Sequence, residues 1–397
     1  MSSKRRPQRG SHATPARSVA TANSARPRVA SPELAPASPA PDAAPTSPGA
    51  VPVAAEAEPQ ALVVSHRFDP GPGGAPPYTA TIRLTGRRRG VVGAPGSEDA
   101  FSTTETVVGV VPGSDPMSTT TWVYGIASGE WDVTAEVIGP ERARAANPTV
   151  LSQVGWSWRR WAMVGVAGPA KTRWALTAPL AAAPGVMTGS FLAAATIALL
   201  GAVAAQPLFL THHGVSVGPA ILASVLAMII GVAGAKAWYM VLKGPSRATL
   251  REGWSVDGFL VSAPVVAVVT GLLLGVPTGG YLDAIAPTIF LAVAVGRVGC
   301  FLTGCCAGRI TTGPGIWSSD RRVGARRIPA QLIESAVGVT LSILTSALVL
   351  GRVAQGTGLV FVGSVVLYAV VRQGLLRLRA ESRRFSWRRA DRGPAAA

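Results

Sequence analysis

Hydrophobic and polar residues follow different patterns in different parts of the chain, and each pattern predicts a different kind of structure. From residue 185 onward, six long apolar segments follow one another, at 186–208, 217–242, 259–276, 285–302, 328–350 and 358–376. Each is about as long as an α-helix must be to cross a hydrocarbon layer of about 30 Å. The pattern therefore predicts an α-helical polytopic membrane region at 185–380, with about six transmembrane helices.

Between residues 61 and 140, apolar and polar residues alternate with a period of two instead. In the segment 130–137, Trp131, Val133, Ala135 and Val137 share one face, and polar residues occupy most of the other. Similar runs at 79–84, 105–111 and 120–124 are separated by Gly, Pro, Asp and Ser. This arrangement predicts a small all-β, sandwich-like domain. We expect an accessory module, because the segment shows no catalytic motif.

Three further segments follow neither pattern. Residues 1–60 contain mainly Ala, Pro, Ser and Arg, which predicts a disordered tail because too little apolar surface is available for burial. Residues 381–397 form a basic C-terminal tail. The connector 141–184 brings Trp and Arg together between residues 156 and 161, which suits the headgroup layer of a membrane. A linker or a further piece of the β domain is the alternative for this connector.

Composition supports a membrane protein over a nucleic-acid-binding one. Mean hydropathy is +0.34 and only 14% of the residues are charged. The formal net charge of +17 comes from arginines in tails and loops rather than on one aromatic-studded face, so we interpret it as membrane-surface charge. All three cysteines lie within one short motif, which gives neither a disulfide framework nor a zinc site. No metal and no cofactor is expected.

That motif, at 296–308, reads Gly-Arg-Val-Gly-Cys-Phe-Leu-Thr-Gly-Cys-Cys-Ala-Gly and ends the fourth apolar segment. Arg297 lies near the inner end of a predicted span, where a guanidinium is costly without a partner or water. An arginine fork binds phosphate bidentately. Glycines let the backbone approach a ligand and leave N–H groups free for anions. The motif contributes Gly299, Gly304 and Gly308 as candidates of this kind.

Other spans carry further charged candidates. Arg372 lies in the last span, and Tyr368, four residues earlier, shares its helical face. Glu334 in the fifth span can neutralise one arginine while a lipid phosphate serves the other. A structural ion-pair network is the alternative. Asp257 stands at the start of the third span, where an aspartate commonly caps the helix.

Six ordered blocks between residues 234 and 372 resemble the prolipoprotein diacylglyceryl transferase family. They read Gly-Ala-Lys-x-x-Tyr, Gly-x-Ser-x-Asp-Gly, Asp-x-x-Ala-Pro, Gly-Arg-x-Gly-x-Phe-x-x-Gly-x-x-x-Gly, Arg-x-Pro-x-Gln-Leu-x-Glu and Tyr-x-x-x-Arg. The chain departs from the family where Asp257 replaces a histidine, Cys300 an asparagine and Cys305 a glutamate. The histidine is the family's candidate base for the thiol. Asp257 could replace it only if burial raised its pKa.

The resemblance implies transfer of a diacylglyceryl group from phosphatidylglycerol to the lipobox cysteine of prolipoproteins, in the bacterial inner membrane. Arg297 and Arg372 would hold the phosphodiester, with Asp257 as the third catalytic residue. The residues expected to contact substrate are Tyr368, Glu334, Gly308, Gly299, Gly304 and Cys300. Phosphatidylglycerol and prolipoprotein signal peptides are the expected partners. The alternative is a non-catalytic phospholipid-binding or scaffold protein that kept the arginines and lost the base.

Membrane orientation has two opposing signals. The arginine-rich loop at 309–327 and the C-terminal tail favour the cytoplasmic side. The family instead presents its signature toward the outside. Orientation therefore stays open.

Overall fold

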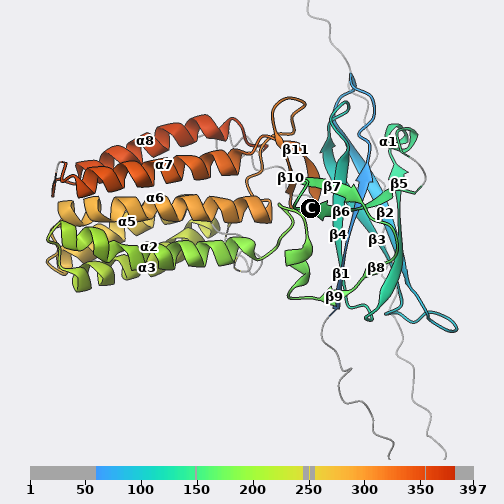
Figure 1. Ribbon diagram of the computed structural model, residues 1–397, viewed down its shortest axis with the longest axis horizontal. Helices are drawn as coiled ribbons and strands as arrows, with labels where there is room; N and C mark the ends of the chain where they lie inside the picture. Colours follow the sequence, from blue (N-terminus) through green and yellow to red (C-terminus); the bar gives the residue numbers. More distant parts are fainter. Residues whose placement is uncertain (1–59, 148–149, 245–249, 251–254, 354, 381–397) are drawn as a thin grey trace, which may run out of the picture. The chain divides into compact units, whose positions relative to one another are not determined.

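The computed structural model describes residues 60–147, 150–244, 250, 255–353 and 355–380. The tails predicted at 1–60 and 381–397 lie outside this part, apart from Gln60, which begins the first strand. Within it, a β-rich domain is followed by a set of helices (Figure 1).

The β-rich domain contains two antiparallel sheets. One has the order β3-β2-β5-β8, and the other has the order β10-β11-β4-β1-β6-β7 with β9 paired to β1. The strands are β1 (Gln60–Phe68), β2 (Tyr78–Arg88), β3 (Ala100–Val110), β4 (Met117–Tyr124), β5 (Glu130–Gly139), β6 (Ser152–Ser157), β7 (Ala162–Gly165), β8 (Ala170–Lys171) and β9 (Arg173–Trp174). The strands predicted from alternation fall within β2 to β5. A β-rich domain is thus confirmed, and its description as a sandwich stays a prediction.

Alternation along the strands explains the core of this domain. Leu62, Val64 and Phe68 of β1 lie in one buried cluster with Ile82 of β2 and Trp131 of β5, so residues from both sheets share a single core. Burial of this apolar surface is the main stabilising contribution to the domain. His66 lies in register between Val64 and Phe68 and is also fully buried.

The predicted connector at 141–184 holds regular structure. It contains the short helix α1 (Glu141–Ala145), strands β6 to β9 and the 3₁₀ turn η1 (Ala178–Ala181). Because β6 and β9 pair with β1, and β8 pairs with β5, the connector contributes strands to both sheets. Its tryptophans cluster: Trp156 contacts Trp158, Trp161 and Trp317.

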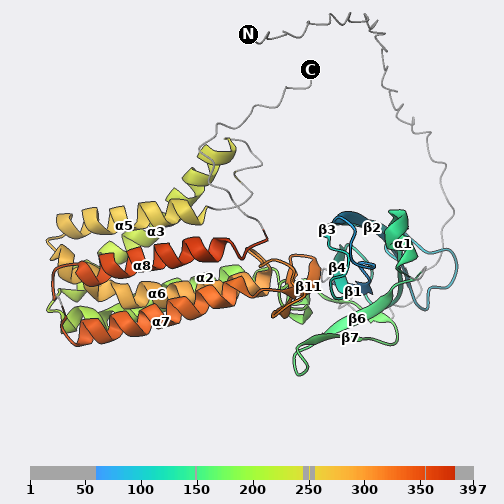
Figure 2. The same cartoon turned by 90° about the horizontal axis from the view of Figure 1, so that it is seen from above.

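The helices are α2 (Ser190–His212), α3 (Val217–Lys243), α5 (Val256–Leu273), α6 (Thr278–Thr303), α7 (Ala330–Leu350) and α8 (Leu359–Leu376). They lie side by side in both views (Figures 1 and 2). Five described helices are long and apolar enough to span a membrane, so the predicted count of six is confirmed for five. The predicted span 259–276 corresponds to α5, whose apolar part, Gly258–Leu273, is shorter. The chain is a multi-pass membrane protein.

Helix α6 is in contact with most of the other helices. It packs against α2, α7 and α8. Asp283, fully buried in α6, accepts hydrogen bonds from the backbone N–H groups of Gly358 (2.9 Å) and Phe361 (3.2 Å) at the start of α8. Gly358 has no side chain to cap the helix, so a carboxylate from α6 satisfies these N–H groups. The contact fixes α8 against α6.

The segment after the signature joins the β-rich domain. Strands β10 (Ile316–Asp320) and β11 (Val323–Arg327) pair with each other, and β11 pairs with β4 through Val323↔Thr119 and Gly324↔Ser118. A Cβ at Gly324 would collide with Trp317 and Ser118, so glycine permits this close approach. A segment between two helices thereby extends the sheet of the β-rich domain.

Candidate functional site

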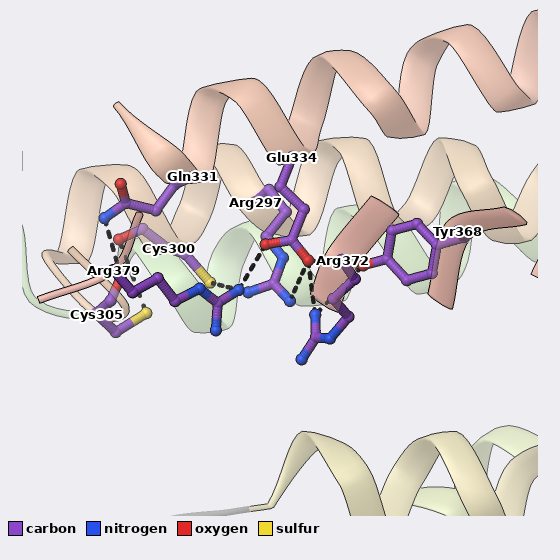
Figure 3. Close-up of polar contacts among 8 residues, drawn as sticks. All are labelled: Arg297, Cys300, Cys305, Gln331, Glu334, Tyr368, Arg372 and Arg379. Atoms are coloured by element: carbon purple, nitrogen blue, oxygen red, sulfur yellow. Dashed lines mark hydrogen bonds and ion pairs between the residues drawn. The ribbon is translucent and has the colours of Figure 1, made fainter. Parts of the chain in front are cut away.

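Three arginines converge on one glutamate at the ends of α6, α7 and α8 (Figure 3). Oε1 of Glu334 lies 2.9 Å from Nη2 of Arg297 and 2.6 Å from Nη1 of Arg372. Its other oxygen, Oε2, accepts a hydrogen bond from Nη2 of Arg379 at 2.6 Å. The Tyr368 hydroxyl donates to Oε1 at 2.8 Å. Four donors, carried by α6, α8 and the segment after α8, therefore meet at a single carboxylate of α7.

This arginine cluster, formed by Arg297, Glu334, Arg372 and Arg379, is largely removed from water. Glu334 is fully buried, and Arg297 is only 6% exposed. Three guanidinium charges face one carboxylate charge, so the cluster carries a formal excess of two positive charges. Buried charge is costly unless it is paired, and a guanidinium fork pairs best with carboxylate or phosphate. The geometry suits the binding of an anion beside Glu334.

The elements that carry these side chains are themselves connected. Arg379 follows α8 and forms a β-bridge with Gly308, the last glycine of the signature. Next to it, Arg309 donates from its backbone N–H to the Leu378 carbonyl at 2.9 Å and from Nε to the Arg379 carbonyl at 3.1 Å. The end of the signature thus holds the segment that delivers Arg379 to Glu334.

Arg379 was missed from the sequence as a site residue, because it reads there as one of several arginines near the C-terminal tail. Its position depends on a pairing with Gly308, which is distant in the sequence, so no local sequence pattern predicts it. The expected pair of Arg297 and Arg372 does meet at Glu334, and Tyr368 joins them. Their assignment to substrate stays a prediction.

The three glycines of the signature each permit a close approach within the protein. A Cβ at Gly299 would collide with Ala194 of α2, and one at Gly308 would collide with the Ile328 carbonyl. Gly304 ends α6 in a left-handed conformation with φ of 78°, close to the backbone of Gly185. Packing and backbone conformation account for these glycines. Their predicted contact with a ligand stays a prediction.

Polar contacts connect Cys300 and Cys305 to the arginine cluster. Nη1 of Arg297 donates to the Cys300 sulfur at 3.8 Å, and the Cys305 thiol donates to the Cys300 carbonyl at 3.7 Å. Gln331 Nε2 donates to the Cys305 carbonyl at 3.0 Å. Figure 3 shows this chain of contacts running from Cys305 to Glu334. No group of three or more metal-ligating side chains occurs among the described residues.

Cys306 differs from the other two cysteines because it is exposed. A hydrogen bond from Cys305, helped by the charges of Arg379 and Arg297, lowers the pKa of Cys306 to about 5 despite partial desolvation. Hydrogen bonds with Cys300 and Cys306, together with burial, raise the pKa of Cys305. Cys306 is therefore a thiolate at neutral pH, next to the arginine cluster.

Asp257 lies in the first turn of α5, as the sequence predicted, while its side chain lies outside the described part of the structure. The next residue, Gly258, lies where α5 packs closely on α3. A Cβ at Gly258 would collide with Trp238 and with the backbone of Gly234. The roles of Asp257 as base or helix cap stay predictions.

The helical region matches a known family. The family profile described as prolipoprotein diacylglyceryl transferase matches residues 188–390, about half of the chain. A phosphatidylglycerol–prolipoprotein diacylglyceryl transferase from Dehalococcoides mccartyi is 28% identical over 164 residues, covering 38% of this chain and 61% of that protein. One from Clostridium tetani is 34% identical over 106 residues, covering 26% and 42%. Transferase 2 from Clostridium perfringens is 30% identical over 127 residues, covering 28% and 48%.

The alignments thus span less than two thirds of these relatives, and no solved structure matches the chain. The matched region contains α2 to α8 and the whole arginine cluster, whereas β1 to β9 precede it. On the extent of the family match, the chain belongs to the prolipoprotein diacylglyceryl transferase family.

Proposed function

We propose that this protein transfers a diacylglyceryl group from phosphatidylglycerol to the lipobox cysteine of prolipoproteins, in the bacterial inner membrane. The convergence of Arg297, Arg372 and Arg379 on buried Glu334 carries the proposal. A phosphodiester has the charge and the shape that a set of guanidinium groups pairs with. The names of the relatives supply the reaction class.

The chemistry places a specific demand on the arginines. The substrate sulfur forms a new bond to a glycerol carbon while the bond from that carbon to a phosphate oxygen breaks, and the thiol proton leaves to a base. Glycerol phosphate departs with additional negative charge. Donors held ready for that charge stabilise the transition state, and removing one such donor costs about 100- to 1,000-fold in kcat.

Glu334 has a positioning role in this scheme. Its two oxygens hold Arg297 and Arg372 on one side and Arg379 on the other, so the guanidinium groups stay oriented without substrate. The Tyr368 hydroxyl fixes the carboxylate from a fourth direction. Such preorganisation avoids reorganisation of the charges during the reaction.

Complementation tests the proposal. The full chain, produced in a bacterial strain depleted of its own transferase, should restore the mobility shift of a prolipoprotein. Arg372→Gln should abolish it, whereas Arg352→Gln, at an exposed position beyond α7, should not. Normal processing by the Arg372→Gln variant would contradict the proposal.

Asp257 separates an enzyme from a non-catalytic lipid-binding relative. If Asp257 is the base, Asp257→Asn abolishes transfer while phosphatidylglycerol binding persists. If Asp257 only caps α5, the change is nearly silent, because asparagine caps about as well as aspartate. Activity gained only by Asp257→His would mark the natural chain as a binding protein.

A further inference from the structure

A cavity of about 580 Å³ lies where the β-rich domain meets the signature segment. This volume falls within the range of about 300–1,000 Å³ typical of ligand sites. The residues that line it are Trp122, Tyr124, Thr188, Thr303, Cys305, Arg321 and Arg322.

The two walls of this cavity come from different parts of the chain. Trp122 and Tyr124 belong to β4 and precede residue 188, where the family match begins. The other lining residues belong to the matched region. Residues from outside the family match and residues of the signature thus line the same cavity.

The register of β4 explains why its aromatic residues face this way. Thr119, Thr121 and Val123 alternate with Ser118, Thr120, Trp122 and Tyr124 along the strand, and Val123 belongs to the inner core. Trp122 therefore faces outward, where it packs against Ala182, Val186 and Met187 just before α2. Tyr124, two residues on, is 56% exposed.

A chain of polar contacts links one wall of the cavity to the arginine cluster. Cys305 lines the cavity, and the Cys305 thiol donates to the Cys300 carbonyl. The sulfur of Cys300 in turn accepts from the Arg297 guanidinium. Thr303, which also lines the cavity, is the last residue of α6. The cavity therefore begins where the membrane span ends and lies on the signature side of the helices.

The wall chemistry favours a polypeptide over a lipid. Indole, phenol and guanidinium groups are enriched at the centres of protein-binding surfaces. An acyl chain needs a continuous apolar path within the span, whereas this cavity lies at the end of α6 and is lined by its last residue, Thr303. One of its two cations, Arg322, is already paired with Glu105 at 2.5 Å. That pairing reduces the attraction of the cavity for a lipid phosphate.

We propose that the cavity is the docking groove for the segment of the acceptor polypeptide that lies outside the hydrocarbon layer next to its reactive cysteine. Trp122 and Tyr124 form its specificity-determining wall. This assignment rests on the proposed function and names the part of its substrate that the accessory domain recognises. The domain thereby selects the acceptor, while the arginine cluster handles the donor lipid.

Binding of a fluorescent synthetic lipobox peptide to the full-length protein in detergent tests the assignment without requiring turnover. Tyr124→Ser and Trp122→Ala should each weaken binding about tenfold, the size of effect that an aromatic anchor commonly contributes. Trp174→Ala removes an exposed tryptophan of β9 in the same domain and should leave binding unchanged. Tyr124 is more exposed than Trp122, so its variant keeps the test valid if Trp122→Ala fails to fold.

Transfer assays separate this proposal from the proposed function. In reconstituted vesicles, both variants should raise KM for the peptide and leave KM for phosphatidylglycerol unchanged. Peptide binding without any transfer by the natural protein would overturn the proposed function alone. The docking groove would be overturned if Tyr124→Ser and Trp122→Ala bound the peptide as tightly as the natural protein does. It would also be overturned if the natural protein did not bind the peptide. Weakened binding of phosphatidylglycerol vesicles by the variants would assign the cavity to the lipid headgroup instead.

Discussion

Glu334 in the helical region and His66 in the β-rich domain are both fully buried titratable side chains, and their surroundings are opposite. Glu334 has four donors around its carboxylate. Neither ring nitrogen of His66 has a hydrogen-bond partner among the described residues. Burial lowers the pKa of His66 to about 4, so the histidine stays neutral. The interior of the helical region thus contains paired charges, whereas the interior of the β-rich domain contains a polar side chain in its uncharged form.

This difference locates the chemistry. An excess of guanidinium groups around a buried carboxylate can pair with an added anion, whereas His66 is an uncharged side chain buried in register between Val64 and Phe68. The β-rich domain is joined to the helical region through the sheet pairing of β4 with β11.

The largest expected effect comes from removing the charge of Glu334. Glu334→Gln keeps the size of the side chain and leaves three arginines without their counter-charge. Breaking a buried ion pair from one side costs about 3–5 kcal/mol. Thermal unfolding in detergent should show a large fall in Tm, compared with Glu136→Gln at the exposed Arg83 pair as the control. Similar Tm values for the two variants would contradict the special role given to Glu334.

His66 should make the β-rich domain sensitive to acid. Its pKa is lowered in the folded state, so protons bind preferentially to the unfolded state once the pH falls below about 6.5. Stability is constant above that pH and decreases by about 3 kcal/mol as the pH falls toward 4. Hydrogen exchange of β1 and β4 amides in the full chain measures this change. His66→Leu should remove that part of the pH dependence; an unaltered dependence would show that other groups cause it.

Cys306 provides a chemical probe of the arginine cluster. With a pKa of about 5, its thiolate should react with iodoacetamide at pH 6. Cys305→Ala removes the largest cause of that low pKa, so the pH of half-maximal reaction should rise. Buried Cys300 provides the unreactive control within the same motif. Mass spectrometry of the labelled peptides distinguishes the sites. An unshifted profile in Cys305→Ala would contradict the hydrogen bond.

The smallest expected effect concerns the ion pair between Arg322 and Glu105, which links the signature segment to β3. The Arg322 side chain is 55% exposed, so solvent screens the pair and its contribution should be below about 1 kcal/mol. A double-mutant cycle with Arg322→Gln and Glu105→Gln, followed by thermal unfolding, measures the coupling. A coupling of several kcal/mol would mean that this ion pair, rather than sheet pairing, joins the two regions.

Local patterns predicted the elements whose causes are local. Long apolar segments predicted the helices, and the alternation of apolar and polar residues predicted strands in the regions of β2 to β5. Intramembrane charges need partners, so Glu334 was expected to neutralise one of Arg297 and Arg372 and a lipid phosphate the other. In the structure Glu334 pairs with both arginines. Strands β10 and β11 lay in a segment interpreted as an arginine-rich loop, because their pairing with β4 joins residues some 200 positions apart, as Gly324↔Ser118 does. The sequence did not predict Arg379 as a site residue for the same reason, because its bridge to Gly308 is a long-range contact.

The central claim is that the arginine cluster acts on the donor lipid while Tyr124 acts on the acceptor peptide. Steady-state transfer kinetics of the full-length protein test this claim when the concentrations of both substrates are varied. Arg372→Gln and Tyr124→Ser are measured side by side. Arg372→Gln should lower kcat at least about 100-fold and leave KM for the peptide unchanged. Tyr124→Ser should raise KM for the peptide and leave kcat unchanged. Equal loss of kcat in both variants, or a peptide KM that responds to Arg372→Gln alone, would contradict this claim.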